Sequence, residues 1–150
     1  MKFKSVFMVL ILFSLLSSCR TKFSNKVFYA NYGCAHIFEF SRDGFGSLKV
    51  GEYDLDLNEK GTNLNNIKFE KSFKMKDSNL RRLNEIIDTI ENQKLILTDR
   101  TRKGAWYFGL TIENKTKVRI YGEMTDSYNE ILRILLESSK GRSSFDCSDY

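Results

Sequence analysis

Cys34 and His36 are the pair of side chains in this chain of 150 residues that could do covalent chemistry together. A thiol beside an imidazole base is the arrangement of an activated cysteine nucleophile. The two residues are expected on one face of a strand, a face that they share with Phe38 and Phe40. His36 is the one histidine of the sequence, and no third group is evident that would orient it. The sequence therefore does not favour an enzyme, and His36 is expected to be a packed residue.

Asp54, Asp56 and Asn58 have the spacing that opens a calcium-binding loop. An EF-hand loop needs Gly at its sixth position and Glu at its twelfth, where this chain has Glu59 and Asn65. The end of a strand with alternating polar residues explains the spacing better. The sequence thus predicts no metal site and no cofactor.

Aromatic and basic residues near Trp106 form the best candidate for a binding surface. Tyr107, Lys117, Arg119 and Tyr121 are expected on the outer face of one hairpin, and Arg102 precedes it in the sequence. Tyr and Arg are enriched at protein interfaces. Cross-strand aromatic pairs also stabilise any sheet, so a solvent-facing sheet in an aromatic-rich protein is the simpler alternative.

Hydrophobic periodicity indicates the elements that position these side chains. The first strand region comprises 27–32 and 35–40, with a bend or bulge at Gly33 between them. Further strands are expected at 47–57 and 67–75, a short strand at 95–97, and a hairpin of 106–112 and 117–121 that turns at 113–116. Apolar residues at helical spacing predict helices that begin at Asp77 or Ser78 and at Ser127. Ser127 with Glu130 matches a capping box, and Gly141 is the expected C′ residue.

Strands in runs, each run followed by a helix, predict an α+β fold. We expect an antiparallel sheet of about five to six strands, with two α-helices packed on one face. In the strand at 67–75, Ile67, Phe69, Phe73 and Met75 are expected on the buried face.

The first nineteen residues have the pattern of a secretory signal, expected to be helical. Lys2 and Lys4 form a positive n-region, Val6 to Leu16 is a mostly apolar run, and small residues precede Cys19. A transmembrane helix needs about 20 apolar residues, more than this run supplies. An ordinary secretory signal would leave Cys19 incidental, and a buried N-terminal helix would leave its flanking Lys and Cys unexplained.

The segment Leu16-Ser17-Ser18-Cys19 resembles the lipobox of bacterial lipoproteins. The resemblance implies that residues 1–18 are removed and that Cys19 is diacylated and fixes the protein to a membrane. Two acyl chains suit stable anchoring, since a single chain binds a membrane only marginally. Residues 20–26 hold no acidic residue, which by the same resemblance implies the periplasmic face of an outer membrane. Residues 19–26 would then be a tether, and 27–150 a single domain.

Export also determines the interpretation of Cys34 and Cys147. In an oxidising compartment, two remaining cysteines are expected to form a disulfide. A crosslink that closes a loop of about 100 residues can stabilise a fold by up to about 4.7 kcal/mol. Free thiols are the alternative, because bonding requires Cα atoms within about 7 Å.

The charge of the exported chain is mildly positive. Loss of Lys2 and Lys4 with the signal lowers the formal net charge from +5 to +3. Such an excess does not point to nucleic acid, whose binding domains carry a strongly basic patch. Anionic lipid headgroups are a more suitable partner for a slight excess of cations. A solvated surface of mixed charge explains the excess better still.

These observations give one functional hypothesis and one alternative. The first is a lipid-anchored, noncatalytic periplasmic domain that binds a protein or another envelope component. The alternative is an inhibitor or immunity-type protein that acts on a periplasmic or secreted enzyme. A small hydrolase lacks a credible set of acid, base and nucleophile.

Overall fold

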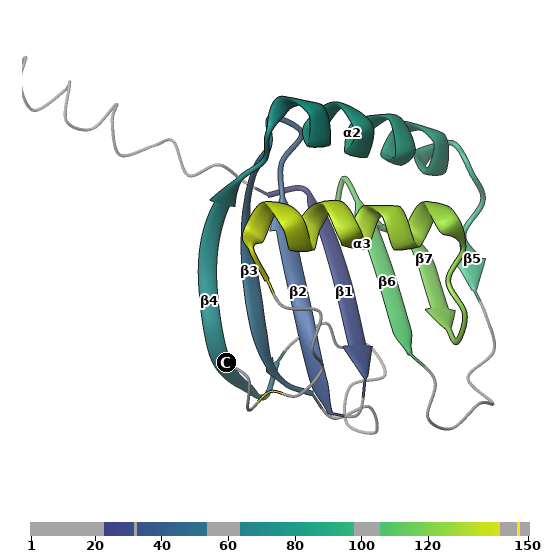
Figure 1. Cartoon of the computed structure of the whole chain (residues 1–150). Coiled ribbons are helices and arrows are strands. Elements are labelled where there is room, and N and C mark those ends of the chain that lie inside the picture. The colour runs from purple at the N-terminus through teal and green to yellow at the C-terminus, as the bar shows by residue number, and fades with distance from the viewer. Residues whose placement is uncertain (1–22, 32, 54–63, 98–105, 142–146, 148–150) are drawn as a thin grey trace, which may run out of the picture.

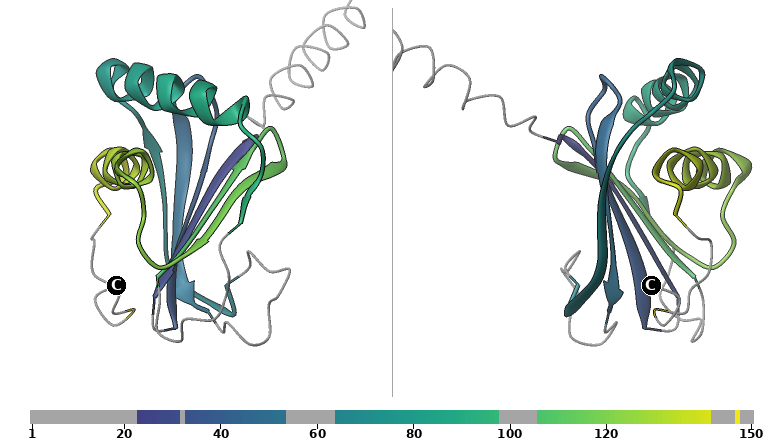
Figure 2. Two further views of the ribbon diagram at one scale, coloured as in Figure 1. Left: turned by 90° about the vertical axis from the view of Figure 1, so that its right-hand side faces the viewer. Right: turned by 60° about the vertical axis from the view of Figure 1, so that its left-hand side comes forward.

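A computed structural model describes residues 23–31, 33–53, 64–97, 106–141 and 147. These residues form a seven-stranded sheet and two helices, and both helices lie on the same face of the sheet (Figures 1 and 2). The predicted α+β class is confirmed, whereas the predicted number of strands was too low. The signal-peptide helix expected within residues 1–18 lies outside the described residues.

Four strands precede the first helix and three precede the second. The sheet order is β4-β3-β2-β1-β6-β7-β5, so the two consecutive runs of strands meet where β1 pairs with β6. Neighbours are antiparallel except β5 and β7, which are parallel, so the sheet is mixed rather than purely antiparallel. The elements are β1 Asn25–Asn31, β2 Cys34–Phe40, β3 Phe45–Glu52, β4 Asn66–Lys74, α2 Asp77–Glu91, β5 Ile96–Leu97, β6 Tyr107–Ile112, β7 Lys115–Tyr121 and α3 Asp126–Ser139.

The additional strand arises at Gly33. Asn31 pairs with Cys34, so β1 and β2 form a hairpin with a two-residue turn instead of one bent strand. Gly33 has a φ of +84°, a conformation that tight hairpin turns demand and that glycine adopts without a steric penalty. The β6–β7 hairpin is closed by Glu113 and Asn114, both with positive φ. Its turn is therefore shorter than the predicted turn at 113–116.

The helices have the predicted apolar faces but different ends. The N-cap residues are Lys76 and Thr125, and neither makes a side-chain capping hydrogen bond, so the capping box predicted at Ser127 is wrong. At the end of α3, Lys140 takes the left-handed conformation and the amide of Gly141 donates to the carbonyl of Leu136. This is the pattern of a Schellman motif, with the left-handed residue one position earlier than predicted.

The edge strand β4 departs from strict alternation. Its register against β3 shifts between Val50 and Gly51, where a Cβ on Gly51 would lie 2.1 Å from the carbonyl oxygen of Asn66. Phe73 is buried as expected, but Ile67, beyond the shift, is 51% exposed. The prediction that Ile67 faces the core is wrong because a bulge re-aims the side chains that follow it.

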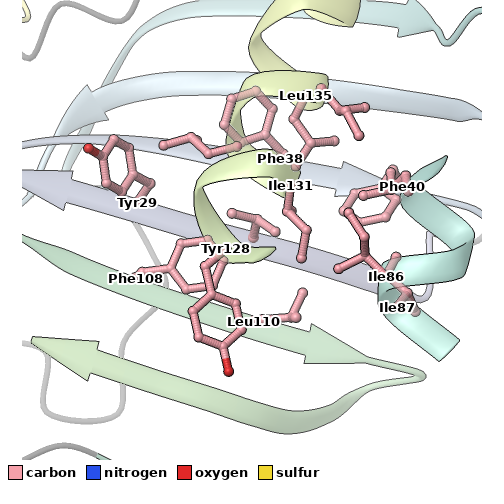
Figure 3. Packing of buried hydrophobic residues seen from close by; sticks show 14 of the residues in the cluster. Tyr29, Phe38, Phe40, Ile86, Ile87, Phe108, Leu110, Tyr128, Ile131 and Leu135 are labelled. Carbon is pink, nitrogen blue, oxygen red and sulfur yellow. The ribbon is translucent and has the colours of Figure 1, made fainter. Parts of the chain in front are cut away.

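The main core lies between the helices and the sheet (Figure 3). Phe38 and Phe108 project from central strands toward Ile131 and Leu135 of α3, and all four side chains are buried. Burying one such side chain stabilises the fold by roughly 1.5–3 kcal/mol. We call this set the helix-facing cluster; it also includes Val27, Phe40, Leu48, Val50, Leu83, Ile87, Leu110, Val118 and Tyr128.

Candidate functional site

The strands β1 and β2 are buried on both faces. Successive side chains of a strand point to opposite sides, so Phe28 lies on the other side of the sheet from Val27, and Ile37 from Phe38. Phe28 and Ile37 belong to a second cluster, on the face that no described helix covers (Figure 2). We call it the helix-free cluster; it consists of Phe28, Ala30, Ala35, Ile37, Tyr53 and Tyr107, with Leu64 and Tyr121 packed against it.

Four aromatic rings of this cluster form a row across the sheet. The Phe28 ring centroid lies 4.8 Å from that of Tyr53 and 5.5 Å from that of Tyr107, both edge-to-face. Tyr107 continues the row to Tyr121, its partner on β7, at 4.9 Å. Tilted and edge-to-face contacts of this kind stabilise a pair beyond the area that it buries. Rings from four separate segments are thus held in one rigid arrangement, which we call the aromatic row.

Gly109 lets the ring of Tyr107 lie close to the sheet. A Cβ at Gly109 would be 3.1 Å from the Tyr107 hydroxyl, and a small depression of about 20 Å³ lies beside them. Lys26 and Arg119 also line this depression. Burial raises the pKa of Tyr107, the neighbouring Tyr121 adds to that rise, and the Arg119 guanidinium opposes it. Burial lowers the pKa of Lys26, while the Glu39 carboxylate opposes that change.

The structure separates the residues of the predicted binding surface. Tyr121 is partly exposed and Arg119 exposed on the helix-free face, next to the aromatic row. Tyr107 is only 7% exposed, so its ring supports this surface more than it offers contact area. Lys117 donates from Nζ to the carbonyl of Glu91, 2.6 Å away at the end of α2, and is therefore engaged with the helix layer. Arg102 lies outside the described residues.

Sequence reasoning missed Phe28, Ile37 and Tyr53 as members of the site. A signal for the first two was present, because the segments 27–30 and 35–38 do not alternate between apolar and charged residues. In an antiparallel sheet with one face in water, strands are expected to alternate. An uninterrupted run in such a sheet indicates a strand that is buried on both faces.

The cysteines and the histidine occupy the helix side of the sheet. Cys34 and Cys147 lie at disulfide distance, with Cα atoms 5.6 Å apart and a sequence separation of 113. Cys147 packs against the helix-facing cluster, which includes Cys34. His36 is 1% exposed, with its ring stacked on Phe38 at 6.3 Å, as expected of a packed residue. Pairing of Cys34 with Cys147 leaves no thiol for a Cys34–His36 nucleophile.

A second concave region lies between the two helices. This groove of about 560 Å³ is within the size range of small-molecule sites. Arg82 and Glu85 of α2 and Ser127 of α3 are among its lining residues, and none of the described lining residues is a histidine or a cysteine. Within the described ranges, no three His, Cys, Asp or Glu side chains are grouped to hold a metal ion. The calcium-like segment from Asp54 to Asn58 lies outside those ranges.

No helix in the described part of the chain is long and apolar enough to cross a membrane. Comparison with known proteins finds no family model, no curated protein and no solved structure that matches this chain. The function must therefore be argued from the chain's own residues. They combine an N-terminal segment in which the sequence predicts a lipoprotein signal with an aromatic row on the helix-free face of an α+β domain.

Proposed function

We propose that this protein is a bacterial lipoprotein that binds a protein or another envelope component without catalysis. Acylated Cys19 would anchor it, as the lipobox-like segment indicates, with the domain in the periplasm at the outer membrane. The observation that carries the binding role is the aromatic row, with Tyr121 and Arg119 at its accessible end. Tyr and Arg are typical anchors of binding energy at protein interfaces.

Rigidity supports this assignment. Tyr121 packs on Tyr107, which in turn packs on the buried Phe28, so its ring is already ordered in the free protein. Ordering a flexible side chain on binding costs about 0.5–1.5 kcal/mol, a cost that such support reduces. Arg119 pairs with Gly109, and both residues line the small depression beside Tyr107. A partner can thus place an acidic or polar group against the exposed Arg119 while it packs on Tyr121.

An oxidising location would also explain the cysteines. Cys34 and Cys147 are placed to bond, and disulfides persist in the periplasm but rarely in the cytosol. The bond would fix Cys147 to the start of β2, next to the hairpin turn at Gly33.

The binding role is tested by crosslinking and affinity capture from cells that carry a tagged full-length protein. Tyr121→Ala and Arg119→Ala should each lower capture of the specific partner about tenfold, the expected effect of a hot-spot residue. Arg81→Ala is the matched control, because Arg81 is an exposed arginine on α2, in the helix layer. Equal capture by all variants would rule out the aromatic row as the contact surface.

The identity of the captured partner separates the two roles considered for this surface. A structural envelope component fits the noncatalytic binding role stated above. A secreted or periplasmic enzyme that loses activity when the purified protein is added would assign the inhibitor or immunity-type role instead.

A further inference from the structure

The short connection between Cys19 and the sheet limits how the domain can sit on a membrane; this inference rests on the proposed lipid anchor. The first strand, β1, begins at Asn25, six residues after Cys19. An extended chain spans at most about 3.6 Å per residue, so Asn25 lies within about 22 Å of the acylated cysteine. The end of the sheet that carries Asn25 is therefore held near the lipid headgroups.

Strand pairing identifies what else lies at this end. Asn25 pairs with Phe40, the last residue of β2, and its side-chain oxygen accepts a hydrogen bond from the amide of Glu113. The β2–β3 turn is at the same end, followed by Phe45, which pairs with Lys74 at the end of β4. Helix α2 crosses the sheet at this end as well (Figure 1). We call the turns at 41–44 and 113–114, with Phe45 and Lys74, the anchor end.

The anchor end has side chains suited to a lipid interface. Phe45 is 42% exposed, and Lys74 Nζ lies 5.0 Å from the centroid of its ring. Phenylalanine rings can insert at the boundary between headgroups and acyl chains, and ammonium groups are attracted to anionic lipids. Arg42 offsets nearby negative charge through ion pairs with Asp88 and Glu91 of α2, at 2.5 and 2.7 Å.

One exposed carboxylate is close to this pair. Asp43 accepts a hydrogen bond from the Ser41 hydroxyl, which lowers its pKa, and the charge of Lys74 lowers it further. The carboxylate therefore stays ionised but lies beside a cation that partly offsets it. Contact with the bilayer is expected to centre on Phe45 and Lys74.

We propose that the bilayer is the partner of the anchor end, with Phe45 and Lys74 at the headgroups and the aromatic row directed away from them. Tyr107 pairs with Ala30 near the far end of β1. A strand rises about 3.3 Å per residue, so Trp106 lies roughly 15–20 Å beyond the anchor end. The anchor end would thus contact the membrane, while the aromatic row would remain accessible to the partner.

The single tryptophan of the chain makes this orientation measurable. The full-length acylated protein is reconstituted in phosphatidylethanolamine–phosphatidylglycerol vesicles whose acyl chains carry bromine, which quenches nearby tryptophan. Native Trp106 should keep its emission. In Phe45→Trp combined with Trp106→Phe, emission should fall by about half or more, since interfacial rings lie next to the acyl chains. Adding Lys74→Glu to that double variant should reduce the quenching.

Two results would overturn the orientation: quenching of Trp106 as strong as that at position 45, or no quenching at either position. Circular dichroism of each variant establishes that the fold is retained. Flotation of the vesicles, compared with a Cys19→Ala variant, tests the anchor by itself. Acylated protein that floats but is quenched at Trp106 would refute the orientation and leave the lipoprotein assignment standing. Absence of acylation would refute both the lipoprotein assignment and the orientation.

Discussion

The two faces of the sheet have the same strands but differ in how they are buried. On the helix side, side chains from β1, β2, β3, β6 and β7 pack against two amphipathic helices. On the helix-free side, the buried hydrophobic residues that the structure describes come from the central strands β1, β2 and β6 and from Tyr53, and they pack mainly on one another. The first face forms a core enclosed by two layers, and the second a thin aromatic layer whose outer members reach the surface.

The difference indicates that the helix side contributes most of the stability, while the helix-free side offers the surface proposed to bind a partner. A core between two layers can tolerate few changes, because its side chains are held from both sides. A thin layer with accessible Tyr121 and Arg119 can accept contacts from another molecule. The faces also differ in charge, since Lys26, Glu39, Lys49 and Glu70 extend along the helix-free face, where their ion pairs meet water.

The largest expected difference between the two faces of the sheet is in the loss of stability when a buried phenylalanine on each face is replaced by alanine. Phe38 is 0% exposed on the helix side and Phe28 is 1% exposed on the helix-free side. Phe38→Ala should lower the free energy of unfolding by about 4–5 kcal/mol, because an enclosed cavity cannot collapse. Phe28→Ala should cost about 3 kcal/mol, since the neighbouring tyrosine rings can move inward. Urea titration of both variants measures this; a larger loss for Phe28→Ala would reverse the ranking of the faces.

The cysteine pair provides the next largest effect. Cys34→Ala combined with Cys147→Ala should lower the free energy of unfolding by about 2–4 kcal/mol, because the crosslink restricts the unfolded chain. The reduced wild-type protein is the matched control, since it keeps both side chains but loses the bond. Agreement between the two measurements would assign the loss to the crosslink. An unchanged urea midpoint after reduction would mean that the sulfurs are not bonded in solution.

Local patterns were sufficient to predict both helices and the β6–β7 hairpin. Their apolar residues follow one clear period each, so the buried faces could be assigned without tertiary information. The division at Gly33 was missed because β1 and β2 are apolar on both faces, and the pattern continues through the turn. The parallel pairing of β5 with β7 depends on the path of the chain after α2, which hydrophobic periodicity does not encode.

The candidate site was predictable only where its residues are close in sequence. Tyr107 and Tyr121 were found because they share one hairpin. Phe28 joins them only because β1 lies beside β6 in the sheet, a pairing between distant segments. Lys117 was misplaced because the β6–β7 register shifts between Leu110 and Thr111, which leaves Lys117 as an additional residue and redirects its side chain.

Tyrosine ionisation distinguishes the faces at alkaline pH. Burial on the helix side raises the pKa of Tyr29 to about 12 from 10.0, so the unfolded chain releases this proton first as the pH rises. Stability from Tyr29 is therefore complete below pH 10 and declines toward pH 12. Tyr29→Phe should flatten this decline more than Tyr107→Phe, because Arg119 opposes the pKa rise of Tyr107. Urea midpoints measured across this range give both slopes, and equal slopes would contradict the difference in environment.

The smallest expected effect is at Lys49, in the charged part of the helix-free face. Lys49 Nζ lies 3.2 Å from Glu39 and 3.8 Å from Glu70, and its side chain is 30% exposed. Exposed ion pairs contribute about 0–1 kcal/mol, so Lys49→Met should lower the free energy of unfolding by less than about 1 kcal/mol. High salt should shrink the difference from wild type, because screening weakens pairs that water reaches. By contrast, Leu48→Ala, one residue away but on the helix side, should cost about 2–5 kcal/mol. A loss at Lys49 as large as that at Leu48, and insensitive to salt, would mean that the helix-free face is sealed from water and is a second core instead of a surface for a partner.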